Sequence, residues 1–177
     1  LSVVSDKEKC TDAVFTRPAG LGSGGDSFYE YLMKLQLLDP LKTEGEKAMY
    51  TRLCDGLESH GFGSVQRHTR PDGRRVAFIM NEMGFHEHLV CFVPGMLALG
   101  SVSLPGRHKD LDFAEEIMEA CIATYEDSPI GLAPDEVSVR AQGETKGRTG
   151  SRYRLRPETM ESLFVLYRVT GKERYRE

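Results

Sequence analysis

The sequence contains no tryptophan, few cysteines and no long apolar run. Its four cysteines are too few for a disulfide scaffold, and none of them shows the CxxC spacing of a zinc site. The longest apolar run, residues 89–99, is interrupted by Pro94 and Gly95 and is shorter than the roughly 20 residues that cross a bilayer. We therefore expect this run to form a buried helix.

The chain also lacks an excess of charge of one sign. It has 23 Lys and Arg against 27 Asp and Glu, which gives a net charge of -4. Acidic and basic residues are interleaved, so there is no basic stripe for nucleic acid and no polybasic segment for a membrane surface. We expect neither partner. The 177 residues, 40% of them hydrophobic, are enough to bury the core of one ordinary domain.

The two ends of the sequence show no terminal signals. No basic and then apolar leader opens the chain, and residues 172–177 resemble the start of an element that is cut off. We therefore expect both ends to be cuts inside a larger protein. From the residues alone, the four cysteines do not decide the cellular compartment, because one bridge in a secreted protein and four thiols in a cytosolic protein fit equally well.

Apolar residues recur every three or four positions in several segments, which predicts helices. The first runs from Asp26 to Leu38 and is closed by Pro40, and the second begins at Thr43 and stops at Gly61. Others cover residues 88–100, 111–125 and 157–170. Outside the mostly apolar 88–100 segment, the stripe residues expected to pack are Phe28, Tyr31, Leu32, Leu35, Leu38, Met49, Leu53, Leu57, Leu111, Ala114, Ile117, Met118, Cys121, Tyr125, Met160, Leu163, Phe164 and Tyr167.

The period changes between the second and third helices. Residues 64–69 and 74–80 flank Pro71-Asp72-Gly73, which predicts a β-hairpin. Residues 129–150 are rich in Gly, Pro and charge and contain one short strand-like run, 136–140, so they are predicted to be a long surface connection. Helical pairs with broad apolar faces indicate an all-α toroid or bundle with a small β-hairpin insertion.

Carboxylates stand at two predicted helix starts. Asp26 follows Gly24-Gly25, and Glu158 and Glu161 follow Arg156-Pro157 and share one helical face. Such a cluster could hold a hydroxyl group or a water. The alternative is that these acids only cap their helices, since carboxylates are favoured at helix N-termini.

His88 precedes the most apolar segment of the chain, which places it at the buried mouth of a helix. A histidine in such a position is either a hydrogen-bonded structural residue or part of a site.

Three blocks of the sequence resemble successive signature motifs of glycoside hydrolase family 47, the class I α-1,2-mannosidases. They are GGDSFYEYL at 24–32, HLVCFVPGMLALG at 88–100 and LRPETMESLF at 155–164. The resemblance extends from Phe15 to the end of the chain, while residues 1–14 match nothing. It implies that residues 1–177 are a fragment of one catalytic domain, part of an (α/α) barrel of seven helical hairpins.

The resemblance also implies an activity: inverting, calcium-dependent hydrolysis of terminal α-1,2-linked mannose from high-mannose N-glycans. Glu158 matches the candidate general base, and Asp26 matches an aspartate that positions the catalytic water or relays a proton. His88, Arg156 and Glu161 match residues that line the mannose subsites. Inversion needs one carboxylic acid and one carboxylate with room for a water between them.

Two cysteines, Cys91 and Cys121, match the pair that forms the family's disulfide. This implies the lumen of the endoplasmic reticulum or Golgi, in a parent that a missing N-terminal segment could anchor as a type II membrane protein. Cys10 and Cys54 have no counterpart, so they are either free thiols or a second bridge.

Two parts of the family pattern lie outside this chain: the general acid glutamate and the threonine that binds Ca²⁺. We therefore expect no metal ligand in residues 1–177, and a fragment that is inactive alone and prone to aggregate. Gly24 stands where the family carries arginine or leucine to select the mannose branch, which leaves that choice open. The alternative function is a non-catalytic, lectin-like factor in glycoprotein quality control, although such relatives lack the cysteine pair.

Overall fold

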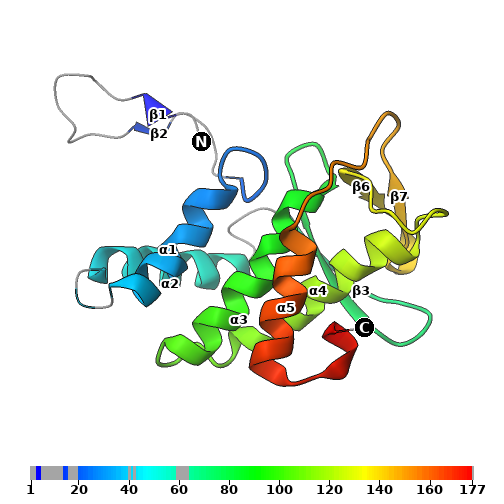
Figure 1. Ribbon diagram of the computed structural model, residues 1–177. Helices are drawn as coiled ribbons and strands as arrows, with labels where there is room; N and C mark the ends of the chain where they lie inside the picture. The colour runs from blue at the N-terminus through cyan, green and yellow to red at the C-terminus, as the bar shows by residue number, and fades with distance from the viewer. Residues whose placement is uncertain are drawn as a thin grey trace.

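The computed structural model describes residues 3–4, 14–15, 20–39, 41, 43–58 and 64–176 (Figure 1). The helices in these ranges are α1 (Asp26–Leu38), α2 (Glu44–Glu58), α3 (Val93–Ser103), α4 (Asp110–Glu126), α5 (Glu158–Thr170) and the short 3-10 turns η1 (His88–Phe92), η2 (Ala141–Gly143) and η3 (Glu173–Tyr175). Their spans agree closely with the predicted helices. Gly61, the predicted stop of the second helix, lies outside the described residues.

The strands form two antiparallel sheets. A minimal one pairs β1 (Val3–Val4) with β2 (Val14–Phe15). The larger has the order β3-β4-β5-β6-β7, from β3 (Ser64–Thr69), β4 (Arg75–Met80), β5 (His86–Glu87), β6 (Glu136–Val139) and β7 (Thr145–Gly147). The predicted hairpin is confirmed as β3 and β4. An all-α class was therefore incomplete, because the supposed surface connection supplies β6 and β7 to the sheet.

The central helix α3 is buried on nearly every side and packs against α1, α4 and α5. Small residues bring its neighbours close. A Cβ added at Gly95 would lie 3.0 Å from the Ser162 hydroxyl of α5, and one added at Gly100 would lie 2.0 Å from the Tyr50 hydroxyl of α2. Figure 1 shows α5 running beside α3. This packing places the start of α5 next to η1, which leads into α3.

The buried faces of α1 and α5 differ from the predicted stripes. In α1 the buried residues are Tyr29, Leu32, Met33 and Gln36, and in α5 they are Thr159, Ser162 and Leu166. The predicted stripe residues that are exposed instead are Phe28, Tyr31, Leu35, Leu38, Met49, Met160 and Phe164. In α5, the close approach of Ser162 to Gly95 of α3 places a small side chain at this contact, while Met160 and Phe164 are exposed. In the described part of the chain, no helix is long and apolar enough to span a membrane.

Candidate active site

The starts of η1 and α5 bring His88 and Glu158 together. Each residue opens its element, and η1 packs directly on α5. Nδ1 of His88 lies 3.5 Å from Oε2 of Glu158, and the two side chains are 3% and 18% exposed. Pro157 is the N-cap of α5, so the helix begins at the carboxylate itself. His88 and Glu158, which come from two separate sequence motifs, are thus neighbours in the fold.

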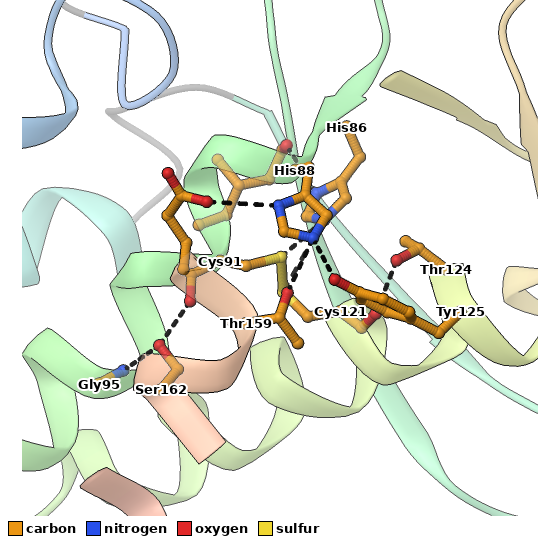
Figure 2. Close-up of a disulfide and its surroundings, with 11 residues drawn as sticks. His86, His88, Cys91, Gly95, Cys121, Thr124, Tyr125, Thr159 and Ser162 are labelled. Carbon is orange, nitrogen blue, oxygen red and sulfur yellow. Dashed lines mark hydrogen bonds and ion pairs between the residues drawn. A yellow bond between two sulfur atoms is a disulfide. The ribbon is translucent and has the colours of Figure 1, made fainter. Parts of the chain in front are cut away.

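Two hydroxyl groups hold the other side of the His88 ring, as Figure 2 shows. Nε2 lies 2.7 Å from the Tyr125 hydroxyl and 3.2 Å from the Thr159 hydroxyl. Burial, and after it the positive charge of Arg156, lower the pKa of His88 to about 4, so the ring is neutral at physiological pH. With Nε2 accepting the Tyr125 hydroxyl, the single proton of the neutral ring is on Nδ1, which faces Glu158.

Several neighbours shift the pKa of Glu158, some upward and some downward. Burial is the main cause that raises its pKa, and the nearby negative charges of Asp26 and Glu161 act in the same direction. The positive charge of Arg156 and the backbone amide at the start of α5 oppose the rise. The net result is a raised pKa, which makes the ionised carboxylate a stronger base. Asp26, the first residue of α1, thus lies within electrostatic reach of Glu158.

Arg156 is oriented by an acid that lies outside the three motifs. Its Nε donates to a carboxylate oxygen of Asp135, and Arg154 contacts the other oxygen at 3.0 Å. The backbone carbonyl of Asp135 accepts the His88 amide at 2.9 Å. One residue of the loop before β6 therefore positions both the arginine and the histidine.

Glu161 faces α1, one turn along α5 from Glu158. Lys34 donates to Glu161 at 3.0 Å and to Glu30 at 2.6 Å, so it joins the two helices. A small groove between α1, α3 and α5 lies against these polar groups and is also lined by Phe92 and Val165. Glu161 is 42% exposed, which leaves it accessible to a ligand.

The predicted disulfide between Cys91 and Cys121 is confirmed, and it joins η1 to α4. It lies close to the His88 site, because Cys91 is one turn from His88 and Cys121 is one turn from Tyr125 (Figure 2). Cys54 is a buried free thiol whose pKa burial raises to about 12. Cys10 lies outside the described residues.

Gly24 precedes α1 with a φ of 92°, in the region that disfavours residues with a side chain. An arginine or leucine at this position would strain the backbone. Glycine at position 24 therefore fits the positive φ of the backbone there, in addition to lacking the side chain that the family pattern carries.

Four residues of this site were not predicted from the sequence as site residues: Tyr125, Thr159, Asp135 and Lys34. Two had a usable signal. Lys34 stands four residues after Glu30 on one helix, the spacing of an ion pair, and Thr159 adjoins Glu158. Tyr125 was expected only to pack, and Asp135 lies in a Gly- and Pro-rich stretch without periodicity, so only the folded chain reveals their roles.

Comparison with known proteins identifies the family. The model of glycosyl hydrolase family 47 matches residues 3–177. The human endoplasmic reticulum mannosyl-oligosaccharide 1,2-alpha-mannosidase is 36% identical over 168 residues, which is 89% of this chain and 23% of that protein. A probable mannosyl-oligosaccharide alpha-1,2-mannosidase 1B of Neosartorya fischeri is 36% identical over 87% of this chain and 33% of its own length.

The fold agrees with a solved structure of the same kind. An alpha-1,2-mannosidase from Trichoderma reesei superposes with a TM-score of 0.74 at 28% identity, covering 93% of this chain and 37% of that one. The present chain thus spans about a quarter to a third of the curated relatives it matches. On the family model, the curated relatives and the fold together, the chain belongs to glycosyl hydrolase family 47.

Proposed function

We propose that this chain forms part of a catalytic domain that removes α-1,2-linked mannose from high-mannose N-glycans with inversion at the anomeric carbon. The observation that carries the proposal is the position of Glu158, half-buried at the start of α5, with a raised pKa and a neutral His88 beside it. We propose further that the helices form a portion of a seven-hairpin (α/α) barrel, and that the parent acts in the lumen of the endoplasmic reticulum or Golgi.

In the proposed reaction Glu158 accepts a proton from the water that attacks the sugar. Its raised pKa increases its basicity, while the positive charge of Arg156 opposes that rise and favours the ionised carboxylate. Nδ1 of His88 faces Oε2 at 3.5 Å, on the same side as the water to be activated. Asp26 contributes a second negative charge beside the water, and Arg156 and Glu161 offer a donor and an acceptor for sugar hydroxyls.

Calcium has no complete ligand set among the described residues. Ca²⁺ takes six to eight oxygen ligands. The one group of at least three close ligand residues within the described ranges is His86, Cys91 and Cys121, which offers nitrogen and sulfur. The residues at hand therefore do not fit the ion on their own, and no step above depends on it. We propose that the oxygen ligands come from parts of the parent outside this chain.

A chimera tests the proposal. Residues 20–176 would replace the segment of the Trichoderma reesei enzyme on which they superpose, so that the remaining barrel is supplied. We expect mannose release from a Man9 glycan, with the β-anomer appearing first in a proton NMR time course. The 177-residue chain alone should release none. A folded chimera that binds the glycan without cleaving it would instead support a lectin-like function.

A further inference from the structure

His86 lies in β5 with its ring enclosed in the core beside the disulfide (Figure 2). The residue is 1% exposed, and the ring of Phe78 meets it edge to face at 5.3 Å between centroids. Nδ1 lies 3.1 Å from the carbonyl oxygen of Ile79, which can only accept a hydrogen bond. Burial lowers the pKa of His86 to about 4, so the ring is neutral, its one proton is on Nδ1, and Nε2 carries a free lone pair.

That lone pair faces the two sulfur atoms of the disulfide. Nε2 lies 3.8 Å from Sγ of Cys91 and 4.0 Å from Sγ of Cys121. A disulfide has no proton to donate to it, so in the oxidised chain the contact is packing alone. The three atoms come from β5, η1 and α4, and all lie within 4.8 Å of one another.

In the dithiol form the same three atoms are a ligand set for a thiophilic metal ion. Zinc binds thiolate at about 2.3 Å and imidazole at about 2.0 Å, so ligand atoms on a tetrahedral ion are about 3.5 Å apart. The distances from Nε2 to the sulfurs are already close to this value. The hydrogen bond from Nδ1 to Ile79 is the kind of outer contact that orients a metal-binding histidine.

We propose that the reduced chain binds one divalent ion of the zinc class through Nε2 of His86 and the thiolates of Cys91 and Cys121. An external dithiol supplies two electrons, which cleave the S–S bond, and is itself oxidised to a disulfide while its two protons pass to the cysteine sulfurs. The metal ion then replaces those two protons. A water completes the tetrahedron, as in zinc sites with three protein ligands.

The ion would join the same elements as the disulfide. Cys91 is three residues after His88, and Cys121 is four residues before Tyr125, so a bond between η1 and α4 fixes both partners of the His88–Tyr125 contact. The metal thus preserves the geometry of the candidate active site in a chain whose disulfide has not formed. It also shields the two thiols from mispairing with Cys54, the free cysteine of the described core.

Cobalt titration tests this site in the full 177-residue chain. Cys10→Ser and Cys54→Ala leave two thiols, and a phosphine reduces the disulfide before its removal under nitrogen. We expect one Co²⁺ per chain, with thiolate charge-transfer absorption in the near ultraviolet, tetrahedral bands in the visible and displacement by Zn²⁺. His86→Ala should weaken Co²⁺ binding at least about tenfold. His108→Ala removes an exposed histidine and should leave it unchanged.

Two further measurements separate a built site from two loose thiols. Circular dichroism of the oxidised His86→Ala and His86→Gln variants checks that each folds with its disulfide intact. Zn²⁺ should raise the melting temperature of the reduced parent and not that of either His86 variant. Absence of Co²⁺ binding, aggregation of the reduced chain in place of binding, or equal affinity in the folded His86 variants would overturn the proposal.

Discussion

Nδ1 of His88 and Oε2 of Glu158 face each other at 3.5 Å, and neither atom has a hydrogen-bond partner among the described residues. Buried polar atoms in this state are rare and costly, and a catalytic role is one of the few reasons for which proteins keep them. Both side chains are held from behind, the histidine by two hydroxyls and the glutamate by the start of α5. The two side chains are therefore held in place, and their unpaired polar atoms are available to a ligand.

Glu158 should lower the stability of the fold. Its raised pKa means that the folded chain binds the proton more tightly than the unfolded chain, whose value is near 4.5. The cost appears as the pH rises through 4.5 toward the folded value and persists at neutral pH. Glu158→Gln should therefore raise the melting temperature at pH 7 and lose this advantage at pH 3. Glu82→Gln, in an exposed turn, is the control; a lower melting temperature than this control at pH 7 would contradict the account.

Arg156 should set the pH at which the site works. A general base acts when it is ionised, so the rate rises with pH through the pKa of Glu158, which the charge of Arg156 lowers. In the active chimera, Arg156→Ala should move the acidic limb of the kcat profile to higher pH. Arg154→Ala is a matched control, because Arg154 contacts the same Asp135 but is 61% exposed. Identical limbs in the two variants would show that Arg156 does not act on the base.

The disulfide should carry a large share of the stability of this chain. It closes a loop with a sequence separation of 30, for which loop entropy predicts a stabilisation of about 3.6 kcal/mol. Cys91→Ala with Cys121→Ala should reduce the free energy of unfolding by about that amount, measured by urea denaturation. Cys54→Ala deletes one buried sulfur without opening a loop and should cost less. Equal losses in the two variants would rule out a loop-closure effect.

The outward apolar residues of α1 and α5 should make the isolated chain self-associate. Leu38 is 76% exposed and Phe164 is 65% exposed. Exposed apolar patches of this kind promote aggregation. Leu38→Lys with Phe164→Lys should lower the apparent mass in light scattering. Gln66→Lys with Ser103→Lys adds the same charge at exposed polar positions, and an equal decrease there would assign the effect to charge alone.

The helix boundaries could be predicted because their signals are local. Pro157 and Gly171 mark the start and the end of α5 through backbone constraints, and Gly171 does adopt the left-handed conformation, with a φ of 68°. The buried face of a helix depends instead on its neighbours. Met160 and Phe164 follow the helical period, yet α5 approaches Gly95 of α3 through Ser162, and both larger side chains are exposed.

The candidate site was predicted in its residues but not in its contacts. Glu158, Asp26, His88, Arg156 and Glu161 were found through the motifs, and the fold places each of them within electrostatic range of at least one other. Their catalytic and binding roles stay predictions. The partners Asp135 and Tyr125 are 47 and 37 residues from His88 along the chain, too far for any periodic signal. Strands such as β5 and β7, with two and three residues, are too short to show alternation.

The most direct test of the central claim is the rate of mannose release by the chimera when Glu158 is replaced. Glu158→Gln keeps the size of the side chain and removes the base, so the rate should fall by about 10²-fold or more. Glu82→Gln should leave the rate unchanged. A Glu158→Gln chimera that folds, binds the glycan and still releases mannose within a few-fold of the parent rate would contradict the assignment of Glu158 as the base.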